Sequence, residues 1–399
     1  MVFLESMTAA VTVIGLLQVL IAAGLVVRFA RAERAVPYWR PPVTVLKPLH
    51  GGEPLLEEAL ATICQQDYPR WQVVFGVQDD NDPAVAVVHR LQARFPGCDI
   101  ALVIDPTMHG RNRKVGNLMN MLPSARHDVL VLADSDVHVR ADYLDRLVCA
   151  LAKPGVGLVT TIYAGLPASD AAIARQGAAQ ITYGFLPGAL MSRAIGRQDC
   201  LGATMCLRRG DLVRCGGLRG LVDHLADDNV LGRRITGLGL QIAMADTVPL
   251  TTVPEDCVAA LFRHELRWAR TIRALEPAAY AASVLQYPLA WAMLTVLLAG
   301  GALWSVGLFV MAWLLRGVAG VTVDRALAPH WDGEAGASAA FRCPVWLLPA
   351  RDLLSVGVMV ASYGGRHVHW RGHGLHADTP VHPAEDTVRF RPIEEINAR

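Results

Sequence analysis

The chain has 399 residues, of which 53% are hydrophobic and 18% are charged, and its mean hydropathy is +0.32. That composition argues against a purely soluble protein, although the length would accommodate two soluble domains. A formal net charge of +1 gives no reason to expect nucleic acid as a partner. The eight cysteines show neither a Cys-x-x-Cys pair nor a zinc spacing, so we expect reduced, mostly buried thiols.

The first apolar run covers residues 6–27 and carries no charge, which is long enough to cross a bilayer as a helix. Glu5 is the only charge before it and no small-residue cleavage site follows, so we expect a retained anchor, not a signal peptide. Four arginines follow directly, at positions 28, 31, 34 and 40. Because basic residues flank spans on the cytosolic side, we expect residues 1–40 to be an anchor and basic linker that leads into the cytosol.

The next part of the chain alternates apolar runs with segments of helical spacing. We expect strands at 43–48, 71–77, 100–104, 129–132 and 156–163, and helices at 55–65, 85–95 and 114–122. A mainly helical stretch to residue 195 and a helix at 230–238 follow. Strands that alternate with helices are typical of βαβ units and a mostly parallel sheet. The sequence therefore predicts a doubly wound α/β domain over residues 41–276.

An acidic cluster follows the strand expected at 129–132. Asp134 and Asp136 stand just past its carboxyl end, where open α/β sheets bind ligands. Two carboxylates at i and i+2 can reach one divalent cation and, through it, a diphosphate. Mg²⁺ or Mn²⁺ suits oxygen ligands of this kind. We therefore predict a metal site at Asp134 and Asp136, with a turn of solvated acids as the alternative.

Asp79 is the first acid after the strand at 71–77, so we expect it at the same sheet edge as Asp134. There its carboxylate can accept hydrogen bonds from a uracil N–H or from ribose hydroxyls, whereas the alternative is an ordinary turn acid. Arg113 and Lys114 lie between the two acids in the sequence. Lys114 either meets a diphosphate as a point charge or is a solvated residue at a helix start.

Asp227 and Asp228 precede the helix expected at 230–238. Acids are favoured at a helix start by the macrodipole, so capping is the alternative explanation. Two adjacent acids exceed what capping needs, and we predict that Asp228 points into the cleft as a general base. The small residues of segment 202–204 would allow a sugar to approach closely.

His264, Arg267 and Trp268 lie on a predicted helix at i, i+3 and i+4 and so share one face. Trp can stack on a ring of the ligand, and the Arg guanidinium can donate two parallel hydrogen bonds to a phosphate. An uncharged run begins at residue 277, shortly after this helix. An interfacial belt of Trp and Arg is therefore the alternative.

The C-terminal part contains two further apolar segments. Residues 277–315 are uncharged and too long for one helix of about 20 residues. Gly300 and Gly301 near the middle predict a tight hairpin of two spans. Residues 344–365 are interrupted by Arg351 and Asp352 and either span the membrane or lie in its interface. We expect a membrane region at 277–365, three or four membrane helices in all, and a polar tail at 366–399.

Taken together, the acids and the Arg–Trp pair resemble the D, D, D, (Q/R)xxRW pattern of membrane glycosyltransferases. The chain is most similar to the ceramide glucosyltransferase family, through segments at 45–49, 67–69, 77–79, 117–119 and 316–318. Within that family it resembles bacterial hopanoid-biosynthesis glycosyltransferases, chiefly through residues 262–271. The resemblance covers residues 43 to about 372. The family's fourth motif begins with Gln or Arg, whereas this chain has His264.

The resemblance implies a GT-A fold, a UDP-sugar donor, a divalent metal (Mg²⁺ or Mn²⁺) and inversion at the anomeric carbon. In that scheme Asp228 deprotonates the acceptor, while Arg267 and Trp268 brace the leaving diphosphate. The metal–diphosphate is engaged by Asp134 and Asp136. The expected donor-binding residues are Asp79, Lys114, Asp134 and His264.

The sequence thus predicts a multi-pass glycosyltransferase of the bacterial inner (cytoplasmic) membrane, with a cytosolic catalytic domain that moves one sugar from a UDP-sugar to a lipid hydroxyl. The resemblance favours N-acetylglucosamine and a hopanoid, bacteriohopanetetrol; the alternative is a ceramide glucosyltransferase that uses UDP-glucose. A processive polysaccharide synthase would need a channel of more helices. A non-catalytic membrane scaffold would not require all of the acids and the Arg–Trp pair.

Overall fold

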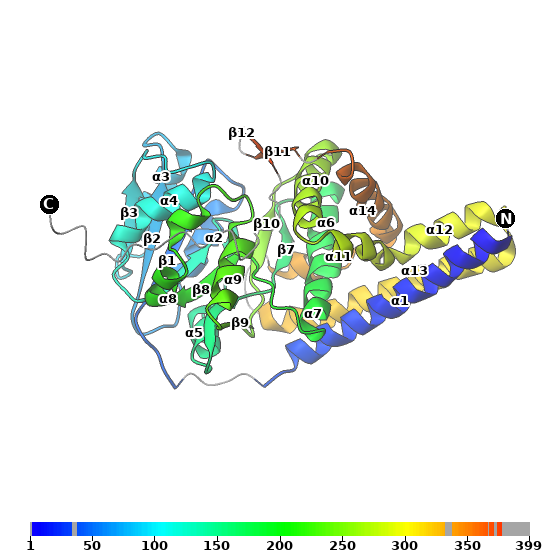
Figure 1. Ribbon diagram of the computed structural model, residues 1–399, viewed down its shortest axis with the longest axis horizontal. Helices are drawn as coiled ribbons and strands as arrows, with labels where there is room; N and C mark the ends of the chain where they lie inside the picture. The colour runs from blue at the N-terminus through cyan, green and yellow to red at the C-terminus, as the bar shows by residue number, and fades with distance from the viewer. Residues whose placement is uncertain (1, 34–37, 332–336, 366, 371–372, 377–399) are drawn as a thin grey trace.

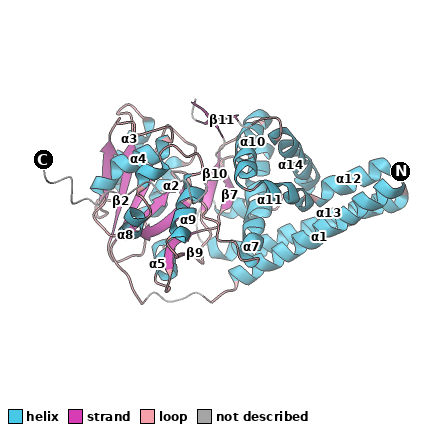
Figure 2. Cartoon of the chain, in the orientation of Figure 1, coloured by secondary structure: helices cyan, strands magenta, loops and turns pink. Residues whose placement is uncertain are grey.

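The computed structural model describes residues 2–33, 38–331, 337–365, 367–370 and 373–376. Figure 1 shows an α/β body beside a long helical arm, which consists of α1 (Val2–Ala30), α12 (Pro288–Leu298) and α13 (Leu303–Leu327). In Figure 2 the strands gather in the body, and further helices lie between the body and the arm. These intermediate helices are α6 (Ala172–Gln180), α7 (Leu186–Ala194), α10 (Val258–Leu275), α11 (Pro277–Ala282) and α14 (Leu348–Ser362).

A seven-stranded sheet forms the centre of the body, in the order β3-β2-β1-β4-β8-β6-β9 over the described residues. Its strands are β1 (Val43–Pro48), β2 (Trp71–Val77), β3 (Ile100–Ile104), β4 (Val129–Ala133), β6 (Val156–Thr160), β8 (Thr204–Arg208) and β9 (Gln241–Met244). β1 to β4 are mutually parallel, as are β6 and β9. β8 runs antiparallel to both β4 and β6. The predicted mostly parallel sheet is confirmed.

Helices cover both faces of this sheet, which is why its central strands are apolar on both sides. The helices of the body are α2 (Leu56–Ile63), α3 (Pro83–Arg94), α4 (Arg113–Met121), α5 (Tyr143–Leu151), α8 (Arg209–Arg214) and α9 (Asp227–Gly237). On one face, Val45 shares a core with Leu60 of α2 and Leu144 of α5. On the other face, Leu132 shares a core with Leu118 of α4 and with α9. Alternate residues of each strand thus serve two separate cores.

A second, three-stranded sheet follows the acid cluster and has the order β5-β10-β7. Its strands are β5 (Val137–His138), β7 (Ala164–Pro167) and β10 (Leu250–Val253). Thr252 of β10 donates its backbone N–H to the carbonyl of Asp136 at 3.1 Å. This small sheet therefore fixes the backbone at the point where the chain leaves the end of β4.

The described residues contain three helical stretches that are long and apolar enough to cross a membrane: Val2–Ala30, Leu303–Trp331 and Val345–Ser362. A fourth span results if the bent pair Pro277–Gln286 and Pro288–Leu298 counts as one. The members of this pair meet at 65°, so the first half of the expected hairpin is a broken helix, not a straight span. Gly300 and Gly301 adopt positive φ angles of 59° and 77° and form the turn between α12 and α13.

Arg351 and Asp352, which interrupt the last apolar segment, are both buried in α14. The Arg351 guanidinium makes a two-pronged ion pair with the Glu265 carboxylate of α10, at 2.7 and 2.6 Å. Asp352 accepts a hydrogen bond from the backbone N–H of Leu289 at 3.0 Å. The two charges in this apolar segment therefore join α14 to α10 and to α12.

Several element predictions need correction. The strand expected at 156–163 ends at Thr160, and β7 occupies part of the stretch expected to be helical. The helix expected at 230–238 begins three residues earlier, at Asp227. All eight cysteines are thiols outside any disulfide, as expected, but Cys257 is exposed and three others are half-buried. Apart from β11 (His367–Trp370) and β12 (His373–His376), the predicted polar tail lies outside the described residues.

Candidate active site

Lys114, at the start of α4, lies among the acids that the sequence singled out. Its Nζ is 2.6 Å from Asp134 Oδ1 and 3.9 Å from Asp227 Oδ2, and its side chain is 15% exposed. Burial alone lowers the pKa of Lys114, but Asp134 and Asp227 outweigh burial and raise the pKa above its ordinary value. Lys114 is therefore a half-buried, charged group that lies between the acids of β4 and α9, not a solvated residue at a helix start.

Asn112 connects the starts of α4 and α9. Its side-chain oxygen caps α4 by accepting from the backbone N–H of Val115 at 3.1 Å. Its Nδ2 donates to the His224 carbonyl at 2.8 Å and to Asp227 Oδ1 at 3.2 Å. This buried amide holds Asp227 toward Lys114. Nothing in the sequence marked Asn112 beyond the general preference for Asn at helix starts.

Asp227 and Asp228 occupy the first turn of α9, yet no side chain caps this helix. Burial, together with the charge of Asp227, raises the pKa of Asp228 to about 6. Gly202 packs against this carboxylate, since a Cβ at that position would lie 2.9 Å from Asp228 Oδ2. Asp228 Oδ1 also accepts from the backbone N–H of Asn229 at 2.7 Å, so a favourable interaction with the helix start accompanies the raised pKa. A carboxyl group with a pKa near the working pH has the property that a general base requires.

The turn Asp134-Ser135-Asp136 rests on a second lysine, Lys47 of β1. Lys47 Nζ donates to the backbone carbonyls of Asp134 at 2.8 Å and of Val137 at 3.1 Å. Burial lowers the pKa of Lys47 to about 8, against the opposing charges of Asp136 and Asp134. Lys47 thus stabilises the backbone of the acid cluster from within the sheet.

Two further side chains orient this turn. Thr251 Oγ1 donates to Asp136 Oδ2 at 2.5 Å, and Ser135 Oγ donates to Glu53 Oε2 at 2.6 Å. Burial, together with the charge of Asp134, raises the pKa of Asp136 to about 6. The carboxyl group of Asp136 is thus half-buried and held in one orientation by Thr251.

The oxygen donors of Asp134 and Asp136 fit a hard divalent cation. Across the residues that the structure describes, no three His, Cys, Asp or Glu side chains gather as metal ligands. Mg²⁺ commonly takes one or two protein carboxylates and completes its shell with phosphate oxygens and water. A cation at this turn would therefore depend on a bound diphosphate for further ligands, and the metal site stays a prediction.

Asp79 follows β2 at the same edge of the sheet, and β1 lies between β2 and β4. Two strand spacings put the ends of β2 and β4 about 10 Å apart. The side chain of Asp79 is exposed and accepts from the backbone N–H of Asn81 at 2.9 Å, a bond that lowers the pKa of Asp79. The structure thus places Asp79 at the sheet edge that the sequence predicts, but apart from Lys114 and its partners Asp134 and Asp227.

His264, Arg267 and Trp268 share one side of α10, as predicted from their spacing. The His264 and Trp268 rings meet edge-on with centroids 4.8 Å apart. His264 Nδ1 pairs with the Glu255 carboxylate. Burial opposes ionisation of Glu255, but His264 and Arg267 outweigh it and lower the pKa of Glu255. Glu255, which precedes α10, gave no signal in the sequence.

Trp268 faces the body of the protein. It packs against the same buried cluster as Tyr163 and Phe185, whose ring centroids lie 4.8 Å apart. Burial raises the pKa of Tyr163, and the charges of Asp228 and Asp134 raise it further. Tyr163 therefore stands between the α10 residues and the acid cluster. An exposed interfacial belt does not describe this tryptophan.

The chain matches the family described as glycosyl transferase family 21 over residues 7–380. It is 25% identical over 242 residues to ceramide glucosyltransferase 3 of Caenorhabditis elegans, covering 59% of this chain and 52% of that protein. It is 25% identical over 339 residues to an N-acetylglucosaminyltransferase of Bradyrhizobium diazoefficiens, covering 79% and 65%. The chain thus spans about half to two thirds of the length of these two relatives.

Among solved structures, the chain is similar to a mannosyltransferase from Pyrobaculum calidifontis in complex with GDP-mannose and Mn²⁺. The TM-score is 0.50 at 22% identity, covering 90% of this chain and 99% of the other. That likeness, with the sheet order above, defines a GT-A fold, as the sequence predicted. The chain belongs to glycosyl transferase family 21, which contains the ceramide glucosyltransferases that it resembles.

Replacement of Asp228 by Asn tests whether the charge of this half-buried carboxylate destabilises the folded protein. Its pKa in the folded protein is raised from 3.8 to about 6, so the folded state loses stability as the pH rises through that range. We expect Asp228→Asn to stabilise the protein at pH 7.5 by up to about 3 kcal/mol, from about 1.4 kcal/mol per pKa unit. The gain should shrink below pH 6 and disappear below about pH 4.

The measurement is thermal unfolding of the detergent-solubilised chain across this pH range. Asp256→Asn is the matched control, because Asp256 is exposed and its removal should change stability little. The expectation would be contradicted if Asp228→Asn and the unsubstituted chain had equal melting temperatures at pH 7.5.

Proposed function

We propose that this chain is an inverting, UDP-sugar-dependent glycosyltransferase that adds one sugar to the hydroxyl of a membrane lipid. The observation that supports the proposal most is the position of Asp228. It is a half-buried acid with a raised pKa, and it lies beside the Lys114–Asp134 pair at the end of β4. A base beside a diphosphate-binding edge is what sugar transfer to an alcohol requires.

In the proposed reaction, the acceptor oxygen attacks the anomeric carbon of the donor while its proton passes to Asp228. The bond between the anomeric carbon and the diphosphate oxygen breaks, and UDP leaves with the bonding electrons. Attack opposite the leaving group inverts the anomeric configuration. Burial of Asp228 supports this role because it keeps the carboxylate basic and shields it from bulk water.

The donor would lie along the sheet edge from Asp79 to Lys114. Asp79 would bind the nucleoside, and Lys114 would bind the diphosphate through its positive charge. In the structure that charge is paired with Asp134. Arg267 and Trp268 brace the leaving diphosphate, and His264 supports them through its pair with Glu255. A Mg²⁺ or Mn²⁺ ion at Asp134 and Asp136 would supply charge neutralisation on UDP.

We favour N-acetylglucosamine as the sugar and a polyhydroxylated hopanoid, bacteriohopanetetrol, as the acceptor. The match to an N-acetylglucosaminyltransferase supports that sugar, and it extends over more of this chain than the ceramide glucosyltransferase match. The hopanoid rests on the resemblance of residues 262–271. Transfer of glucose to ceramide is the second candidate, favoured by several relatives of that name.

We place the protein in the bacterial inner membrane, with its α/β body in the cytosol. The arginines at positions 28, 31, 34 and 40, which follow the uncharged run of residues 6–27, support that orientation. In this arrangement residues 1–40 anchor the chain, 41–276 carry the chemistry, 277–365 form the second membrane region and 366–399 are a tail. A cytosolic site draws the UDP-sugar from water and the lipid from the inner leaflet.

Incubation of membranes containing the chain with each UDP-sugar and each lipid, followed by mass spectrometry, tests the substrates. We expect one N-acetylhexosamine added to bacteriohopanetetrol. A hexose added to ceramide, with no product from the hopanoid, would establish the second candidate. Products with several sugars would indicate a processive synthase instead.

Asp228→Asn should leave UDP-sugar binding intact while lowering turnover by about 10²-fold or more, because the acceptor loses its base. Asp227→Asn is the neighbouring control and should do less. In the unsubstituted chain, turnover should fall as the pH drops below about 6. Near-normal turnover in folded Asp228→Asn would rule out its role as base.

Removal of divalent cations should abolish transfer, and Mg²⁺ or Mn²⁺ should restore it. The reason is that Asp134 and Asp136 present oxygen donors to a cation that also binds the diphosphate. Asp134→Asn should lower activity more than Asp136→Asn, since it also removes the partner of Lys114. Full activity after exhaustive chelation would show that the pair has another role.

A further inference from the structure

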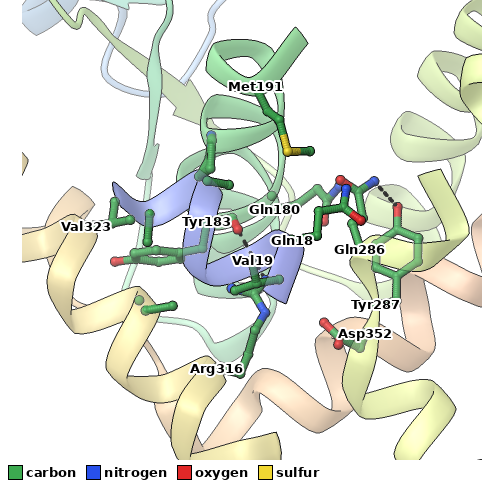
Figure 3. A pocket seen from close by; sticks show the side chains of 17 residues that line it. Gln18, Val19, Gln180, Tyr183, Met191, Gln286, Tyr287, Arg316, Val323 and Asp352 are labelled. Carbon is green, nitrogen blue, oxygen red and sulfur yellow. Dashed lines mark hydrogen bonds between the residues drawn. The ribbon is translucent and has the colours of Figure 1, made fainter. Parts of the chain in front are cut away.

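A cavity lies where the helical arm meets the helices next to the body, away from the acid cluster. It is bounded by α1, α7, α13 and the π-helical segment Ile181–Phe185, and Figure 3 shows the side chains that line it. The hollow holds about 530 Å³ of empty space, a figure that includes space open to solvent. Arg316 lies 13 residues along α13 from Leu303, about 20 Å from the far end of the arm. Because α13 ends 11 residues beyond Arg316, at Leu327, this part of the cavity lies about midway along the helix.

One wall of the cavity is polar. Arg316 is 6% exposed, and its Nη2 donates to the Tyr183 carbonyl at 3.2 Å. Its buried Nε has no hydrogen-bond partner within the described residues. Asp352 lies close enough to interact with Arg316 electrostatically, so their formal charges cancel. A buried N–H without a partner is costly, and an oxygen of a ligand would satisfy it.

The rest of the lining combines uncharged polar groups with an apolar wall. Gln18, Gln180, Gln286 and Tyr287 offer amide and hydroxyl groups on one side, as Figure 3 shows. Small and apolar residues, among them Ala22, Gly188, Ala319 and Val323, complete the lining. This combination suits a molecule with an uncharged, hydroxyl-bearing head and an apolar body. An anionic phosphate would lack a net positive charge to bind.

The cavity is close to the proposed base. Tyr183 lines the cavity, and Phe185, two residues on in the same π-helical segment, stacks on Tyr163. Tyr163 in turn is close enough to Asp228 to interact with its charge. Leu201 packs into the hydrophobic cluster that contains Tyr183, and its neighbour Gly202 touches Asp228. One helical segment therefore separates the cavity from the acid cluster. Such π-helical turns often occur at functional sites.

We propose that this cavity binds the polar head of the lipid acceptor, with the Arg316 Nε–H donating to one of its hydroxyl oxygens. The inference rests on the proposed function and adds the place where the acceptor enters. An uncharged lipid alcohol lies in the membrane against α1 and α13 while its head occupies the cavity. From there the reacting hydroxyl passes the π-helical segment to reach Asp228.

Gly188 allows the cavity to be filled without removing a polar group. It lies on α7, and a Cβ there would be 3.7 Å from Gln286 Oε1, an ordinary contact. We expect Gly188→Leu to raise the KM for the lipid acceptor at least tenfold and Gly188→Ala to raise it less, with the KM for the UDP-sugar unchanged. Gly307→Leu on α13 is the matched control, because nothing lies within 4 Å of that position. Both KM values of the control should match those of the unsubstituted chain.

Three results would overturn the inference. The first is an unchanged acceptor KM in Gly188→Leu that binds UDP normally. The second is a loss of kcat alone, which would indicate a general structural defect. The third comes from photoreactive lipids: labelling of the cavity peptides by a phosphatidylglycerol probe, but not by a lipid alcohol probe, would make the cavity a phospholipid site.

Cross-linking also separates this inference from the proposed function. If the unsubstituted chain transfers sugar to no lipid alcohol, the proposed function fails. Labelling of the α7 residues by the alcohol probe, abolished by Gly188→Leu and retained in Gly307→Leu, would still support the cavity as a lipid-alcohol site.

Discussion

The arrangement of the site depends on one half-buried cation. Lys114 brings together acids from the end of β4 and from the start of α9, which lie far apart in the sequence. Without its charge, Asp134, Asp227 and Asp228 would repel one another. In the proposed function the same ammonium attracts a diphosphate, which would compete with Asp134 for it. Under that proposal, donor binding and the loss of the Lys114–Asp134 ion pair are coupled through one side chain.

Lys47, which is fully buried, acts on the backbone of the acid cluster. It binds backbone carbonyls on both sides of Asp136 and so fixes the direction in which the turn leaves β4. Burial lowers its pKa to about 8, yet both of its printed hydrogen bonds go to carbonyl oxygens, which either protonation state can still donate to. One lysine sets the electrostatics of the acids, and the other sets the geometry of the chain that carries them.

Much of the fold was predictable because the parallel strands β1, β2 and β3 are apolar runs ended by turn residues, and their bounds match the prediction. β8 was missed because its antiparallel pairing with β4 and β6 depends on contacts distant in sequence. Of the site, the acids and α10 residues stood out by type and spacing. Lys47 did not, because a lysine near the end of an apolar run also suits an exposed strand end. Glu255 and Asn112 act only through partners that the folded chain brings to them.

The forked pair between Arg351 and Glu265 joins a membrane helix to the helix that carries Arg267 and Trp268. Glu265 lies between His264 and Arg267 in the sequence, so the last apolar helix of the chain helps to set the rotation of that motif. A fragment that ended after α10 would keep every acid of the site yet leave Glu265 buried without its counterion. The α/β body and α10 are thus not independent of the membrane helices, and a change in bilayer thickness that moved α14 would also move α10 through this ion pair.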